Sequence, residues 1–164
     1  MGSRMDCSTR GAGWIICWRC SLGLWAAQHR GASIWRIPLA FVSVMALGGI
    51  LGLTGATVPG VEFGIALSVL ALGALIATAT RFQPTWSMAL VGLFALFHGY
   101  AHGHEMSAAV GALPFSMGFI LSTLTLHALG IGAGLSLQQQ PRVIRVAGLG
   151  IAACSALCFP GLAV

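Results

Sequence analysis

The sequence predicts an all-α fold, a polytopic bundle of transmembrane helices. The first observation is composition, since 57% of the 164 residues are hydrophobic and only 7% are charged. A soluble domain carries about 25% charged residues on a surface that faces water, so a lipid surface explains this chain better. The second observation is length, because several apolar stretches reach the roughly 20 residues that cross a bilayer.

Five long apolar stretches lie at 36–58, 61–80, 86–104, 109–137 and 143–163. Gly, Ala and Ser are scattered through them, as in membrane helices that pack closely, and β-branched residues are too sparse for barrel strands. A sixth stretch, 11–28, is shorter and carries Arg19, which costs about 2.5–3.5 kcal/mol near the centre of a span. We therefore expect five spans plus one marginal N-terminal span, with residues 22–164 forming one transmembrane domain.

The charged residues predict an orientation. The net charge of +5 arises from eight Arg and no Lys. Arg occupies alternate gaps between the apolar stretches, whereas the gaps around Pro59 and Glu105 contain none. The positive-inside rule makes the Arg-bearing gaps cytoplasmic. We expect a multi-pass protein of a bacterial-type inner membrane, with the lipid bilayer as partner, no nucleic acid, and the segment 98–105 near the extracytoplasmic face.

The densest chemistry is the segment His98-Gly-Tyr-Ala-His102-Gly-His104-Glu105. On a helix, His98 and His102 are i,i+4 neighbours, and Glu105 follows three residues later on the same face. Imidazole suits Ni, Co, Zn and Cu, and ionisable residues in a span indicate function. The pattern predicts a transition-metal site in which Glu105 supplies negative charge and His104 recruits metal at the mouth. The alternative is a polar helix end near the interface.

His127 is a second candidate ligand, in the middle of a long apolar stretch. A single buried His more often packs or forms a hydrogen bond, but the nearby cluster favours a ligand or relay that faces it. A haem held by His127 and a His of the cluster is a further alternative. No Gly-x-Ser-x-Gly or His-Glu-x-x-His occurs, so we expect no enzyme and no organic cofactor.

The small residues of the cluster have expected roles of their own. Gly99 and Gly103 would allow a neighbouring helix to approach closely. Tyr100 would anchor the helix at the membrane interface.

The segment 97–105, together with Gly118-Phe119, the segment 126–130 and the segment 23–28, resembles the hydrogenase/urease accessory protein (HupE/UreJ) family of nickel and cobalt permeases. The resemblance covers about 21–164. It implies a small six-helix membrane protein with a cleaved signal peptide that passes Ni²⁺ or Co²⁺ to metalloenzyme maturation proteins. Metal would move by exchange between imidazole and carboxylate ligands. The alternative is a membrane assembly chaperone that binds metal without transporting it.

The first 21 residues depart from this family. Its first-helix signature, His-Pro-x-x-Gly-x-Asp-His-Leu-Leu-Ala-Met, is absent, residues 1–10 lack the apolar core of a signal peptide, and Cys17-Trp-Arg-Cys20 stands out of place. Consider a shifted reading frame in which each codon consists of the third base of one present codon and the first two bases of the next. In this frame, the codons of Trp14 and Ile15 must together encode Asp, and those of Cys17 and Trp18 must encode Leu. Both match the signature, so we interpret residues 1 to about 21 as an aberrant, out-of-frame segment that lacks the family's first-helix His and Asp.

This interpretation predicts the gene sequence. The codons of Ser8 and Ile15 should end in C, because only C makes the shifted frame read His at both places. A one-base shift should also lie near the codons of residues 21–23. Sequencing the gene checks both points, and another base at either third position contradicts the interpretation.

Overall fold

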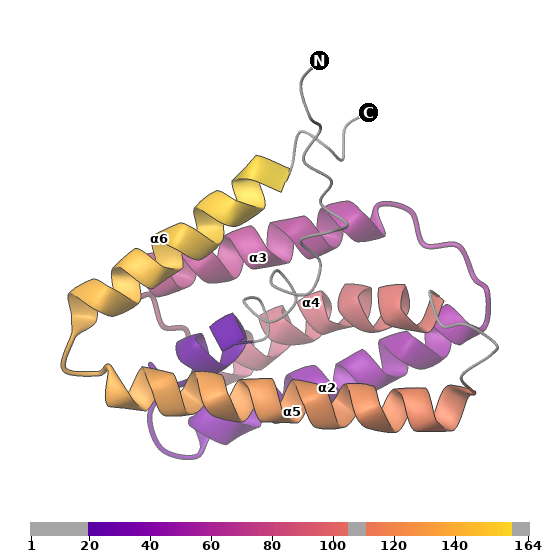
Figure 1. The fold of residues 1–164 in the computed structure, drawn as a ribbon, viewed down its shortest axis with the longest axis horizontal. Coiled ribbons are helices and arrows are strands. Elements are labelled where there is room, and N and C mark those ends of the chain that lie inside the picture. The colour runs from indigo at the N-terminus through magenta and orange to yellow at the C-terminus, as the bar shows by residue number, and fades with distance from the viewer. Residues whose placement is uncertain (1–19, 105–110, 159–164) are drawn as a thin grey trace.

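The computed structural model describes residues 20–104 and 111–158, and these residues form helices without any strand (Figure 1). A short helix over 20–26 precedes five longer ones: α2 (Ser33–Leu53), α3 (Val61–Thr78), α4 (Pro84–His104), α5 (Ala112–Ser136) and α6 (Pro141–Cys158). The all-α prediction is confirmed for this part of the chain. Glu105 and nearly all of the segment interpreted as out of frame lie outside the described residues.

Three of the described helices are long and apolar enough to cross a membrane: α2, α3 and the part of α5 from Ser116 to Ser136. The sequence predicted five such spans, so two of them, α4 and α6, are not confirmed by length and hydropathy. For α4 the physical reason is polarity, because three His residues lie in its last two turns. The helix α6 has Arg142 and Arg145 near its start.

The helix starts and ends follow from local chemistry. Pro84 and Pro141 open α4 and α6, where the missing N–H of proline costs no helical hydrogen bond. Ala79 ends α3 in the left-handed region, with φ 54°, and Thr80 N–H donates to Leu75 O at 3.0 Å. This turn directs Arg81 toward the same end of the bundle at which α2, α4 and α6 begin.

The α2–α4 contact is backbone against backbone. A Cβ atom at Gly99 would overlap the carbonyl oxygen of Met45, and a Cβ at Gly103 would overlap that of Gly49. On the other helix, a Cβ at Gly52 would collide with the Tyr100 carbonyl. Glycines spaced by four residues, Gly48 and Gly52 on α2 and Gly99 and Gly103 on α4, thus let the two helix axes approach more closely than larger residues would permit.

Two further contacts use glycine in the same way. A Cβ at Gly73 of α3 would lie 2.6 Å from the backbone nitrogen of Ala152 on α6. A Cβ at Gly23 of the short helix would overlap the His127 carbonyl of α5. The short helix is consequently enclosed, and Trp25 on it is fully buried.

The outward face of the bundle is apolar. Trp86 is 70% exposed, Leu121 67% and Val146 67%, and many other large apolar side chains are also exposed. Exposed large apolar side chains occur on each of the helices α2 to α6, whereas a soluble domain carries about 25% charged residues on its surface. Lipid is the solvent that fits this face.

The glycine contact generates a stability prediction. Gly99→Ala should force α2 and α4 apart and lower the free energy of unfolding by about 1–3 kcal/mol, the usual cost of overpacking. Gly132→Ala is the matched control, because nothing lies within 4 Å of a Cβ there. Thermal unfolding of both variants in detergent checks this, and equal melting temperatures would contradict the close approach.

Candidate metal site

His98 lies on α4 and is buried, with 6% of its surface exposed. Its Nδ1 lies 2.8 Å from the Phe94 carbonyl oxygen. A carbonyl oxygen only accepts, so Nδ1 donates the proton of this hydrogen bond. Metal-bound His residues are commonly oriented by this kind of hydrogen bond. Nε2 is therefore the nitrogen of His98 that a metal ion would bind.

His127 lies on α5 and is 1% exposed. Its ring packs edge-to-face on Phe41 of α2, with centroids 5.3 Å apart and planes at 83°. The His98 ring centroid is 6.2 Å from the same Phe41 ring. The structure thus brings two imidazoles from different helices onto one fully buried aromatic side chain.

His102 occupies a different environment, one turn further along α4. Its ring is half-buried and lies 4.2 Å from the ring of Phe119 on α5, centroid to centroid. It also lines a cavity of about 260 Å³ between α2, α4 and α5, together with Met45 and Ser116. His98 and His102 share a helical face, as the spacing predicted, but the structure gives each its own aromatic neighbour.

His104 and Tyr100 lie one turn apart near the end of α4. The two rings stack with centroids 5.6 Å apart and planes at 9°, and His104 is exposed. The Tyr100 hydroxyl donates to the Ala56 carbonyl and accepts from the Val58 N–H at 3.2 Å. Tyr100 is itself 5% exposed. Its contacts hold the α2–α3 connection onto α4, a role that the sequence did not indicate.

The predicted ligands do not converge on one point within the described residues. No group of three or more His, Cys, Asp or Glu side chains is placed there to hold a metal ion. The predicted carboxylate, Glu105, lies outside the described residues. What the structure brings together is the interior pair, His98 and His127, with His102 and His104 at successive positions toward the end of α4.

A fifth imidazole, His29, received no role from the sequence. Its ring stands edge-on to Trp25, with centroids 4.8 Å apart. Nδ1 lies 3.3 Å from the Trp25 carbonyl and Nε2 lies 3.1 Å from Ser87 Oγ. Trp25 Nε1 in turn donates to the Thr80 carbonyl at 3.0 Å. His29 thus joins the short helix to the start of α4, and no spacing motif in the sequence could have revealed this.

The surroundings of His29 disfavour its charged form. Burial of the ring, with a smaller contribution from the positive charge of Arg81, holds the pKa of His29 below its ordinary value of about 6.5, although backbone hydrogen bonds act in the opposite direction. The imidazole is therefore neutral at neutral pH, and the neutral ring accepts a hydrogen bond from the Ser87 hydroxyl at Nε2.

This shift predicts a pH dependence. The unfolded chain takes up a proton at His29 more readily than the folded chain, so folding loses stability as the pH falls through about 6.5. His29→Gln should therefore show a smaller drop in melting temperature than the parent chain between about pH 7.5 and about pH 5.5. His104→Gln, which alters an exposed ring, should keep the parent's dependence. Equal pH dependence in the parent chain and His29→Gln would contradict the buried neutral imidazole.

Comparisons with known proteins identify the family. Residues 18–158 match the model of the HupE / UreJ protein family. The chain is 41% identical over 143 residues to Protein HupE of Rhizobium leguminosarum bv. viciae, an alignment that covers 86% of this chain and 75% of the relative. No solved structure matches. With a family model covering most of its length and this relative beside it, the chain belongs to the HupE/UreJ family of hydrogenase and urease accessory proteins.

Proposed function

We propose that this chain is a multi-pass permease of the bacterial-type inner membrane that passes Ni²⁺ or Co²⁺ toward the maturation of a metalloenzyme such as hydrogenase or urease. The observation that carries the proposal is the interior pair of imidazoles, His98 and His127, on the shared ring of Phe41. Polar side chains inside a membrane helix bundle are costly and are retained for function.

The pair has the chemistry that transient binding of a divalent cation requires. Neutral imidazole is a good ligand for Ni²⁺ and Co²⁺, and the hydrogen bond from His98 Nδ1 to Phe94 leaves Nε2 as its ligand atom. The face of an aromatic ring also attracts a cation, so Phe41 can line the path between the two imidazoles. Two neutral ligands bind weakly enough to release the ion.

The outer ligands complete the proposed path. His104, exposed at the end of α4, would receive the hydrated ion, and His102 and Glu105 would exchange its water for imidazole and carboxylate. The Arg-bearing loops at the other end of the bundle would face the cytoplasm, following the positive-inside rule. In this proposal all five long helices span the membrane, α4 and α6 included.

The proposal also concerns the first-helix His and Asp of the family, which the N-terminal segment of this chain lacks. The short helix at 20–26 packs against α5 beside His127, because a Cβ at Gly23 would overlap the His127 carbonyl. The family's first-helix His and Asp belong just before this helix in sequence. We propose that residues 1–21 are read out of frame and that restoring the frame would add these ligands to the path.

Uptake of radiolabelled Ni²⁺ by cells tests the transport function. His98→Ala and His127→Ala should each lower the uptake rate at least about tenfold, since even groups that only orient a metal ligand contribute 10–100-fold. The matched control is Thr123→Val, a buried residue one turn from His127 whose hydroxyl only bonds the Phe119 carbonyl of its own helix, at 2.8 Å. That control should keep the parent rate at equal protein abundance.

A second measurement separates transport from metal storage or delivery. Equilibrium binding of Ni²⁺ to the purified chain should be weakened by the same two His substitutions, and a frame-restored chain should take up more Ni²⁺ than this one. Binding without any uptake, in both the present and the frame-restored chain, would favour a membrane assembly chaperone. Parent-level uptake in all His variants would defeat the permease.

A further inference from the structure

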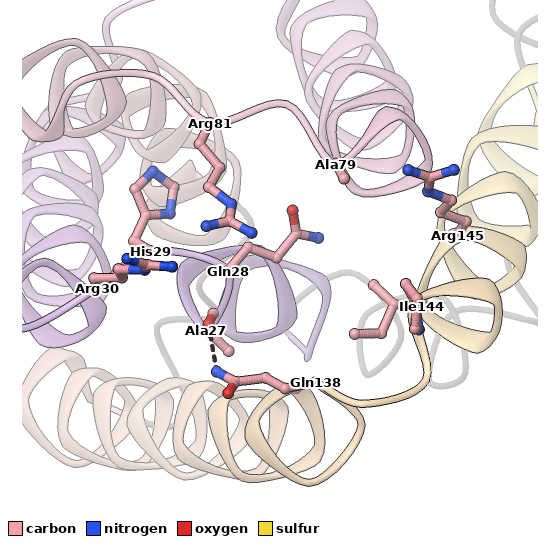
Figure 2. Close-up of a pocket in the computed structure, with 11 residues that line it drawn as sticks. Ala27, Gln28, His29, Arg30, Ala79, Arg81, Gln138, Ile144 and Arg145 are labelled. Carbon is pink, nitrogen blue, oxygen red and sulfur yellow. Dashed lines mark hydrogen bonds between the residues drawn. The ribbon is translucent and has the colours of Figure 1, made fainter.

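A second cavity lies at the end of the bundle where Arg30, Arg81 and Arg145 are found. Figure 2 shows the residues that line it. Its volume is about 280 Å³. Its polar lining includes Gln28, His29, Arg30, Arg81, Gln138 and Arg145. No group in the proposed metal path contributes to it, so it requires an explanation of its own.

The three arginines of this cavity come from three separate parts of the chain. Arg30 follows the short helix, Arg81 follows α3, and Arg145 lies in the first turns of α6. The acidic residue in the described part of the chain is Glu62, at the start of α3. At 1.5 Å per residue, the 18 residues of α3 place Glu62 about 27 Å from the Arg81 end. The positive charge here has no acidic neighbour among the described residues.

Gln28 provides an independent observation. Both polar atoms of its side-chain amide are buried and have no hydrogen-bond partner among the described residues. In Figure 2 the amide projects into the space between Arg81 and Arg145. Gln138 behaves differently, since its Nε2 donates to the Ala27 carbonyl at 3.3 Å. Buried polar groups are almost always satisfied, so the Gln28 amide indicates a polar ligand in this cavity.

We propose that the cavity binds a phosphate group. The planar guanidinium group matches phosphate oxygens through paired N–H donors, and the Gln28 amide offers another donor. The start of α6, where Pro141 lines the cavity, adds the positive end of a helix dipole. His29 is engaged by Ser87 and Trp25 and forms the wall. Because the arginines repel cations, this site is distinct from the metal path and independent of the proposed cargo.

The phosphate group has two sources that a test can separate. The cavity lies where the helices end, which is the depth of lipid headgroups in a bilayer, and anionic lipids attract clustered Arg. Free phosphate presents the same chemistry from the aqueous side. The purified full chain should therefore be tested with radiolabelled inorganic phosphate in an uncharged detergent. A parallel arm compares phosphatidylglycerol with phosphatidylcholine in mixed micelles, by retention of labelled lipid.

Arg81→Gln and Arg145→Gln should each weaken binding of whichever probe binds by about tenfold to a hundredfold, the effect of losing one charge-assisted hydrogen bond. Arg142→Gln is the matched control, because Arg142 lies in the first turn of α6 and outside the cavity lining. Arg142→Gln should change the affinity by less than about twofold. A general attraction of anions to this surface would instead make Arg142→Gln and Arg145→Gln weaken binding equally.

Gln28→Leu separates ligand binding from folding. This change removes the buried amide, so the melting temperature without ligand should stay equal or rise, while binding of the probe weakens. Saturable binding of inorganic phosphate identifies free phosphate as the ligand, and selective retention of phosphatidylglycerol identifies a lipid headgroup. The proposal is overturned if inorganic phosphate is fully displaced by an equal concentration of chloride and phosphatidylglycerol is retained no better than phosphatidylcholine. It is also overturned if Arg142→Gln weakens binding as much as Arg145→Gln.

Discussion

The close approach of α2 and α4 through facing glycines is the contact on which the rest of the structure depends. In lipid, helices gain little from burying apolar side chains, so they associate through backbone proximity and good packing. Gly99 and Gly103 bring their helix against the Met45 and Gly49 carbonyls. The same contact sets Phe41 beside His98 and lets the Tyr100 hydroxyl reach the α2–α3 connection. The position of His98 beside Phe41 thus depends on glycines at the contact between α2 and α4.

The two ends of the bundle carry opposite chemistry. At one end α4 presents imidazoles, from buried His98 to exposed His104. At the other end three arginines surround a cavity whose wall is built by the hydrogen-bonded His29. The two ends therefore favour ligands of opposite charge, with cations favoured at the imidazoles and anions favoured at the arginines.

Local pattern was sufficient for most of the helices. The apolar stretches lie close to the bounds of α2 to α6, and the shared face of His98 and His102 follows from the helical repeat alone. Hydropathy predicted the number of membrane spans less well, since the sequence indicated five and three described helices are long and apolar enough. The helix α4 carries His98, His102 and His104 in its last two turns, and these polar groups lower the apolarity on which such counts depend. The role of Tyr100 was also not predictable, because its hydroxyl bonds a loop more than 40 residues earlier in the sequence.

By itself, the sequence determined that this is an all-helical chain with a lipid-facing surface, that its imidazoles cluster near the end of one helix, and that its family handles nickel or cobalt for hydrogenase and urease. Composition and short-range spacing are sufficient for such conclusions, since they concern one helix or one surface at a time. Only the tertiary structure decided that His98 and His127 share Phe41, that His29 is a buried neutral ring, and that three arginines line one cavity with the Gln28 amide. These groupings join residues from different helices. Their positions depend on how closely glycine lets those helices approach, and that distance is set by three-dimensional packing.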